Sequence, residues 1–317
     1  MFPEPYLSVA PNSQTKLIYA IAGPTASGKT ELGVELALAV RGEVINCDSV
    51  QIYQGIQIAT AKPSDEEKRG VKHHLIDYVS PKVDYTAADW AADAATKISE
   101  IEARGNVPVL VGGTGFYLRT LRQPLFDGPK TDEHLRQRLR AIMGKKGPEY
   151  MHQLLLKIDP NTATKLFPRD YVRVNRALEV YFQTGKTISE QQPNRGEIPE
   201  FAERIRIFVL NPPRDILYAK INERAEGHFA NGLVEEVKHL LQSGVKDTSN
   251  ALGSHGYRRV CEFLRGERII ESAIEKSKQD VRNYAKRQLT WFRREEGVTW
   301  LNGFGEDIDI SQLLSGF

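Results

Sequence analysis

Residues 23–30 combine residue types and spacing that bind phosphate groups. Their sequence, GPTASGKT, matches G-x-x-x-x-G-K-T, in which the glycines let backbone N–H groups point at phosphate oxygens. Lys29 supplies a mobile positive charge, and the hydroxyl of Thr30 can hold a magnesium ion. The candidate phosphate-binding residues are Gly23, Pro24, Thr25, Ala26, Ser27, Gly28, Lys29 and Thr30. The loop predicts a phosphate-bearing ligand without saying which one, and a glycine-rich turn with no ligand is the less favoured alternative.

Asp48 follows an apolar run at 43–47 that predicts a strand, so it lies where ligands bind in open α/β sheets. Three roles are open to it from this position. It can hold Mg²⁺ through water, take a proton from a nucleophile, or cap the backbone of the residues that follow. Thr114 comes after Gly112 and Gly113 at another predicted strand end, where a ligand can approach the backbone closely. The plainer alternative for Thr114 is a turn residue.

Several basic residues are candidate contacts for anions, and each has a plainer alternative. Arg224 stands alone on a predicted helix, and its spacing favours a surface salt bridge. Arg173 and Arg176 share one helix face and can contact nucleic-acid phosphates or pair with nearby carboxylates. His73 and His74 are adjacent, so both cannot easily face one metal ion, and we interpret them as structural.

Short apolar strands alternate with helices around these residues. Strands are expected at 16–22, 43–47, 107–111 and 205–210, and a helix at 86–104 that begins after Thr86. Because strands that alternate with helices form parallel sheets covered on both faces, the pattern predicts an α/β fold. The loop after the first strand makes this a P-loop NTPase-like core.

The strand pattern stops near Pro124 and resumes at 205, with helical, polar sequence between. We therefore predict a parallel-sheet core at 16–123 and 205–317, interrupted by an all-helical insertion domain at 124–204. Residues 1–15 hold three prolines and predict a loose leader.

Composition and charge narrow the class of protein. With 40% hydrophobic and 26% charged residues the chain is globular, and two cysteines favour a reduced, cytoplasmic setting over a disulfide framework. No apolar run approaches the roughly 20 residues that span a bilayer, so no membrane partner is expected. Residues 130–200 carry 13 basic and 9 acidic side chains, and residues 276–294 carry seven and one. These stretches predict either a surface for a polyanion or ordinary solvated helix faces.

A series of motifs, in this order along the chain, resembles the bacterial type of the tRNA dimethylallyltransferases (tRNA isopentenyltransferases). A P-loop is shared by many families, but the other motifs are far more specific, and together they cover nearly the whole chain after the leader. The motifs are GPTASGKTEL at 23–32, DSVQIYQG at 48–55, TAKP at 60–63, LVGGTGFYL at 110–118, RALEVY at 176–181, GKTIS at 185–189, GLVEEV at 232–237, GYR at 256–258 and YAKRQLTWFRR at 284–294.

The resemblance implies transfer of a dimethylallyl group from dimethylallyl diphosphate to N6 of the adenosine just 3′ of the anticodon of a tRNA. Asp48 would orient and deprotonate N6. Thr30 and Lys29 would hold the leaving diphosphate with Mg²⁺, and Arg224 would neutralise it further. The enzyme would act as a monomer on the anticodon stem-loop.

The resemblance also implies the RNA contacts. The target nucleotide would meet Asp48, Ser49, Val50, Gln51 and Thr114. The anticodon loop would meet Arg136, Val172, Arg173, Val174, Asn175 and Arg176.

Two departures from the family pattern affect these expectations. Arg259 stands where the family usually has an acidic residue or glutamine, and the unusual pair Ser254-His255 precedes it. The methionine often found soon after the Arg224 equivalent is replaced in the His228-Phe229 region. We expect both changes to alter the wall or the packing of the substrate channel.

Two other functions are compatible with the P-loop. One is an adenylate isopentenyltransferase, which prenylates a free nucleotide, and the other is a P-loop small-molecule kinase. The helical insertion and the basic segments favour tRNA over a free nucleotide, and the strand before Thr114 ends in no acidic residue, which disfavours ordinary ATP chemistry.

Overall fold

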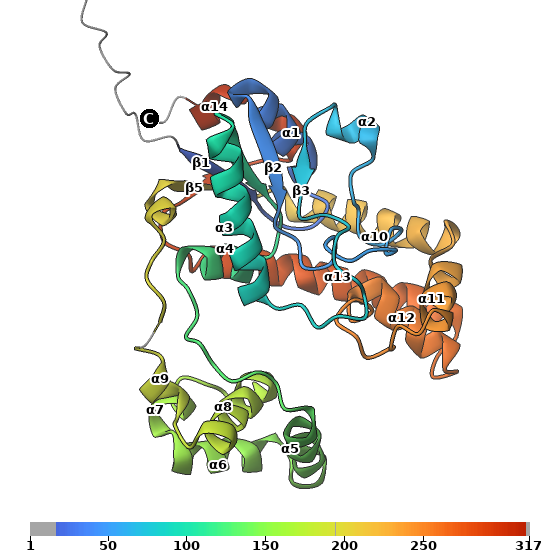
Figure 1. Ribbon diagram of the computed structural model, residues 1–317. Coiled ribbons are helices and arrows are strands. Elements are labelled where there is room, and N and C mark those ends of the chain that lie inside the picture. Colours follow the sequence, from blue (N-terminus) through green and yellow to red (C-terminus); the bar gives the residue numbers. More distant parts are fainter. Residues whose placement is uncertain (1–16, 194, 315–317) are drawn as a thin grey trace, which may run out of the picture. The chain divides into compact units, whose positions relative to one another are not determined.

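The computed structural model describes residues 17–193 and 195–314, so the predicted leader lies outside the described residues. The chain divides into two compact units (Figure 1). The core unit contains the described residues of Met1–Arg122 and Glu200–Phe317, and the insertion unit contains those of Gln123–Pro199.

The core unit is built on a parallel sheet with strand order β3-β2-β4-β1-β5-β6. In the centre, Ala20 of β1 is in register with Leu110 of β4 on one side and Ile207 of β5 on the other. The strands are β1 (Ile18–Ala22), β2 (Gly42–Asn46), β3 (His73–His74), β4 (Val107–Val111), β5 (Ile205–Leu210) and β6 (Val298–Leu301). The four predicted strands are confirmed, whereas the two edge strands, β3 and β6, were not predicted.

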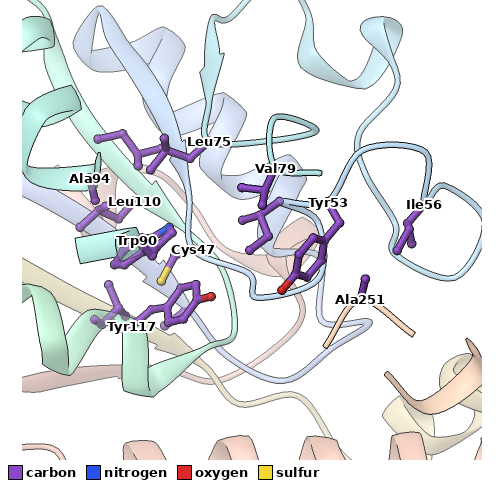
Figure 2. Close-up of a cluster of buried hydrophobic side chains, with 14 of the residues drawn as sticks. Cys47, Tyr53, Ile56, Leu75, Val79, Trp90, Ala94, Leu110, Tyr117 and Ala251 are labelled. Carbon is purple, nitrogen blue, oxygen red and sulfur yellow. The ribbon is translucent and has the colours of Figure 1, made fainter. Parts of the chain in front are cut away.

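Side chains alternate along each strand, so the sheet presents apolar side chains on both faces, and helices pack against each face. On β1, Ile18, Ala20 and Ala22 belong to a cluster that includes α3 (Ala87–Ala103) and α4 (Gly115–Arg122). Figure 2 shows part of this cluster, with Trp90 of α3 near Leu110, Cys47 and Tyr117. On the other face, Tyr19 and Ile21 pack with α1 (Lys29–Val40).

The predicted helix at 86–104 is confirmed as α3. Thr86 forms a capping box with Asp89, and Gly105 adopts a left-handed φ of 80° just after the helix. The remaining elements of the core unit are α2 (Asp65–Lys68), η1 (Glu200–Arg204), α10 (Arg214–Ala230), α11 (Leu233–Gln242), α12 (His255–Leu264), α13 (Ile270–Phe292), η2 (Gly305–Asp307) and α14 (Ser311–Leu314).

All the regular secondary structure of the insertion unit is helical within its described residues, apart from an isolated bridge between Phe126 and Arg195. Its small core is formed by Leu139, Met151, Leu155, Val174 and Leu178. The helices are α5 (Glu133–Lys146), α6 (Pro148–Ile158), α7 (Pro160–Ala163), α8 (Tyr171–Thr184) and α9 (Ile188–Gln191).

The boundary predicted at 204 needs a correction, because residues 200–204 belong to the core unit. Arg204 forms an ion pair with Glu102 of α3, and Phe201 packs against the cluster on that face of the sheet. Among the described residues, no helix has the length and apolar character needed to cross a membrane.

Candidate active site

The phosphate-binding loop joins β1 to α1. Ala26 and Gly28 take left-handed φ values of 62° and 82°, which turn the chain sharply before the helix begins at Lys29. A side chain at position 28 would lie 2.8 Å from the backbone nitrogen of Gly305, so glycine is required by close approach as well. Gly305 in turn donates a hydrogen bond of 2.8 Å to the carbonyl of Ser27, which holds the loop in place.

A pocket of about 480 Å³ opens over this loop. It is lined by residues 25–30 together with Asp48, Gln51, Arg224 and Gln288. A second pocket, of about 90 Å³, adjoins it, since both are lined by Thr25, Ala26, Asp48, Thr60 and Arg224. All of these residues belong to the core unit. Asp48 and Arg224 therefore lie where the two pockets meet.

Asp48 bonds to the described residues through only one of its carboxylate oxygens. Its Oδ1 accepts hydrogen bonds from the backbone N–H groups of Val50 (2.8 Å) and Gln51 (3.3 Å). No helix follows at 49–52, so these two bonds stabilise a turn. Asp48 therefore caps a turn and not a helix. Within the described residues Oδ2 has no hydrogen-bond partner and remains available to a ligand.

The loops after β2 and β4 are fastened to each other. Thr114 accepts a hydrogen bond of 3.1 Å from the backbone N–H of Ser49 and donates its own N–H to the carbonyl of Cys47 at 3.2 Å. Gln51 donates its side-chain amide to the carbonyls of Thr60 (3.0 Å) and Ala61 (2.8 Å). The predicted nucleotide contacts at 48–51 and 114 are thus brought together, and several of them also hold the loops in place.

Gln288 is a site residue that was not predicted individually. Its Oε1 accepts a hydrogen bond of 2.9 Å from Thr25 N–H, and its Nε2 donates one of 2.9 Å to the carbonyl of Gly113. Only 5% of Gln288 is exposed, so this side chain ties the phosphate-binding loop to the loop after β4. The available signal was a polar residue on the apolar face of a helix, at the spacing of Ala285, Leu289 and Phe292.

Lys29 and Arg224 give the larger pocket its positive charge. The Nζ of Lys29 donates to the carbonyl of Pro24 at 2.6 Å, and neither cation forms an ion pair among the described residues. Burial lowers the pKa of Lys29 to about 8; Arg224 adds to this, and Asp48 opposes it. Burial likewise lowers the pKa of Arg224, whereas the negative charges of Asp48 and Glu67 raise it. Both groups are therefore cations for which a bound anion would be the natural partner.

The second pocket is lined by residues at which this sequence departs from the family pattern. His228 of α10 and the pair Ser254-His255 at the start of α12 line it, together with Tyr284 of α13. Burial lowers the pKa of His228 to about 4, helped by Arg224, and lowers the pKa of His255 to about 4, helped by Arg287. The Oγ of Ser254 is buried and has no partner among the described residues. These departures therefore lie in a pocket wall, and their effect on that wall stays a prediction.

Arg259, the other departure, lies outside both pockets and acts in packing. It joins α12 to α13 through Asp280, with Nε 2.6 Å from Oδ2, and it also pairs with Glu262, with Nη1 2.6 Å from Oε1.

His74 is structural, as interpreted, because its Nε2 lies 2.6 Å from the buried carboxylate of Glu43. His73, by contrast, lines the larger pocket. No group of three or more His, Cys, Asp or Glu side chains that could hold a metal ion occurs in the described part of the chain.

The predicted RNA contacts of the insertion unit differ in accessibility. Val172 and Arg173 are exposed at the start of α8. The side chains of Val174 and Asn175 are buried, and Val174 packs in the core of the unit, so direct contact of these two side chains with RNA is a prediction that needs correction. The physical reason is helical periodicity, which turns positions 174 and 175 inward.

The three arginines predicted to contact RNA are all engaged with carboxylates. Arg136 makes two hydrogen bonds, of 2.9 and 3.0 Å, to Glu179, which is only 2% exposed. Arg176 lies 3.7 Å from the same carboxylate and donates to the carbonyl of Pro129 at 2.9 Å. Arg173 pairs with Asp170, the residue that caps α8. Of the three, Arg173 has the most exposed side chain.

Comparison with known proteins places the chain in a family. Residues 51–295 match the family model described as IPP transferase. The chain is 44% identical over 307 residues to the tRNA dimethylallyltransferase of Geobacter metallireducens, covering 96% of this chain and 98% of that protein. It is 43% identical to the tRNA dimethylallyltransferase of Myxococcus xanthus, covering 91% and 93%.

Solved structures agree with these sequence matches. The full-length tRNA isopentenylpyrophosphate transferase of Bacillus halodurans aligns with a TM-score of 0.67 and 38% identity, over 95% of this chain and 93% of that one. A eukaryotic dimethylallyltransferase captured acting on tRNA aligns with a TM-score of 0.75 and 29% identity, over 95% and 78%. The chain therefore belongs to the IPP transferase family of prenyltransferases, together with the tRNA dimethylallyltransferases.

Proposed function

We propose that this protein transfers the dimethylallyl group of dimethylallyl diphosphate to N6 of the adenosine just 3′ of the anticodon in tRNA. The observation that carries the proposal is the junction of the two pockets. There, among the described residues, Asp48 has a carboxylate oxygen without a hydrogen-bond partner, and the cations Lys29 and Arg224 form no ion pair. A base and an anion-binding site side by side suit a reaction in which a proton and a diphosphate leave together. The relatives named as tRNA dimethylallyltransferases supply the substrate class.

The reaction breaks one bond to carbon and one N–H bond, and the site offers an acceptor for each leaving group. N6 of the adenosine attacks C1 of the dimethylallyl group, the C1–O bond breaks, and diphosphate departs with the bonding electrons. The proton lost from N6 passes to Asp48 Oδ2. An exocyclic amine is a poor nucleophile, so stabilising the departing diphosphate is the larger task. Lys29, Arg224 and the backbone N–H groups of residues 26–30 perform it in the larger pocket.

The residues also fit a magnesium ion bound together with the diphosphate. Mg²⁺ is commonly held by one or two protein oxygens plus substrate phosphates and water, so a cluster of carboxylates is not required. Thr30 lines the larger pocket, and its hydroxyl would be the protein ligand. The bound ion would neutralise charge on the leaving diphosphate.

Recognition of tRNA is assigned to both units. The residues at 48–51 and Thr114 would hold the target nucleotide, and the start of α8 with Val172 and Arg173 would meet the anticodon loop. A nucleotide in a loop is already partly unstacked, which lowers the cost of bringing its base into a pocket. Arg136, Val174, Asn175 and Arg176 would support this surface from behind rather than touch RNA.

The setting we propose is cytoplasmic, and the protein would act as a monomer. Cys47 and Cys261 are buried and free, and burial raises the pKa of the Cys47 thiol well above its usual range. Such thiols are inert residues of the core and need no oxidising compartment.

One experiment tests the reaction against its rivals. The protein is incubated with Mg²⁺ and labelled dimethylallyl diphosphate, with total tRNA in one reaction and AMP in another. We expect label in tRNA only, competition by pyrophosphate, and no hydrolysis of ATP. Label in AMP alone would favour the adenylate prenyltransferase, and ATP hydrolysis coupled to product formation would refute the assignment of the loop to the prenyl donor.

A further inference from the structure

The segment that leads into α8 alternates basic and aromatic side chains and presents them to solvent. Lys165, Phe167, Arg169, Tyr171 and Arg173 occupy every second position and are all exposed. Phe167 is 81% exposed, more than any other large hydrophobic side chain in the described part of the chain, and Tyr171 is 49% exposed. A phenylalanine ring left in water is unfavourable for a free surface, so the position calls for a partner.

The backbone that carries Phe167 is held firmly although its ring is exposed. Leu166, next to it, packs against the core of the insertion unit, and its carbonyl accepts a hydrogen bond of 2.9 Å from His152 Nε2. On the other side Pro168 restricts the chain, and a turn closes with Asp170 N–H donating to the carbonyl of Phe167 at 2.9 Å. The ring therefore projects from a fixed turn, which reduces the entropy lost when a partner binds.

The charge around the two rings selects the kind of partner. Lys165 and Arg169 form no ion pair among the described residues, and the single acidic residue of the segment, Asp170, is occupied as the cap of α8 and as the partner of Arg173. Aromatic rings between unpaired cations fit a ligand with flat faces and a negatively charged backbone. Unpaired nucleotides have both properties, whereas a duplex hides its base faces.

We propose that Phe167 and Tyr171 form a stacking surface for unpaired bases of the tRNA anticodon loop, with Lys165 and Arg169 contacting the adjacent phosphates. This inference rests on the proposed function for the identity of the RNA. It adds four residues that were not among the predicted contacts, and it places base recognition on rings instead of on the arginines of α8.

The test measures the affinity of the full-length protein for an anticodon stem-loop RNA and for a blunt duplex of the same stem. Loss of one base–aromatic contact should weaken stem-loop binding roughly 5- to 100-fold in Phe167→Ala. Phe167→Leu keeps the apolar bulk without the ring and should be equally weak, whereas Phe167→Trp should bind at least as well as wild type. Binding to the duplex should change little in all three variants.

Phe182→Ala is the matched control, because Phe182 is 49% exposed at the other end of α8 and lies outside this segment. It should bind the stem-loop like wild type. The inference is overturned if Phe167→Ala matches Phe182→Ala, or if Phe167→Leu retains full affinity, which would indicate a protein-like apolar contact.

The two proposals fail in different ways. Prenyl transfer by wild type with normal stem-loop binding by Phe167→Ala would refute only the stacking surface. Absence of prenyl transfer by wild type, with stem-loop binding that depends on Phe167, would refute only the reaction.

Discussion

Two pairs of basic side chains, one pair in each unit of this protein, are partnered in opposite ways. In the core unit, Lys29 and Arg224 line a pocket without an ion pair among the described residues, and burial lowers the pKa of both. In the insertion unit, Arg136 and Arg176 share the buried carboxylate of Glu179. Lys29 and Arg224 therefore have no anionic partner among the described residues, whereas Arg136 and Arg176 share Glu179.

This difference separates binding residues from structural ones. A partly buried cation without a partner costs free energy that a bound anion recovers, so its position is explained by a ligand. An arginine that satisfies a buried carboxylate is explained by the fold, since removing it would strand that charge. Residue type and spacing alone do not distinguish the two cases. Spacing favours a surface salt bridge for Arg224, and only the family resemblance implies that Arg224 binds diphosphate and that Arg136 contacts RNA.

The largest effect should come from Asp48, whose carboxylate interacts with both Lys29 and Arg224. Asp48→Asn keeps an oxygen to cap the turn at Val50 and Gln51 but cannot accept the proton. We expect prenyl transfer to slow by roughly 10² or more, the usual scale for a general base, with tRNA affinity unchanged. Single-turnover rates with labelled donor, alongside tRNA binding, provide the measurement. Turnover near the wild-type rate in this variant or in Asp48→Ala would remove Asp48 from the chemistry.

Arg224 should rank next. If it stabilises the leaving diphosphate in the transition state, Arg224→Ala should lower kcat and kcat/KM together by about 10²- to 10³-fold. Arg214→Ala is the control, because Arg214 begins the same helix and lines neither site pocket. A variant of Arg224 with altered thermal stability and normal kinetics would restore the salt-bridge interpretation.

The pKa of Lys29 gives a smaller, pH-dependent effect. With a pKa of about 8, Lys29 is charged below pH 8 and becomes neutral above it, so the free site loses its cation as pH rises. Pyrophosphate affinity should therefore fall above about pH 8, by up to about tenfold per pH unit relative to Lys29→Arg, which stays charged. Isothermal titration at several pH values measures this. Parallel pH profiles for wild type and Lys29→Arg would contradict it.

The smallest effect is expected from the paired arginines of α8. Replacing Arg173 and Arg176 with Ala should weaken tRNA binding modestly and reduce its salt dependence by a slope of about 1, because Arg173 is the member of the pair that we expect to contact a phosphate. Pyrophosphate binding should not change, since the phosphate-binding loop belongs to the core unit. An unchanged salt slope with unchanged affinity would assign both arginines to the fold, and the RNA surface would then rest on other cations, such as Lys286, Arg287, Arg293 and Arg294.

Much of the architecture could be predicted from the sequence because its determinants are local. The strands at β1, β2, β4 and β5 are short apolar runs, the phosphate-binding loop is one continuous motif, and Thr86 with Asp89 marks the start of α3. The edge strands escaped prediction because β3 has only two residues and β6 is only partly buried, so neither shows a clear apolar pattern.

The sequence by itself determined the candidate residues for the chemistry, namely the loop at 23–30 and Asp48 at a strand end. Only the tertiary structure decided which side chains surround them. Gln288 bonds to Thr25 across 263 positions of the chain, and His228 reaches the second pocket from one helix while His255 reaches it from another. The tertiary structure also decided which cations form ion pairs, because an ion pair between distant residues forms only when the fold brings the two charges within a few ångströms.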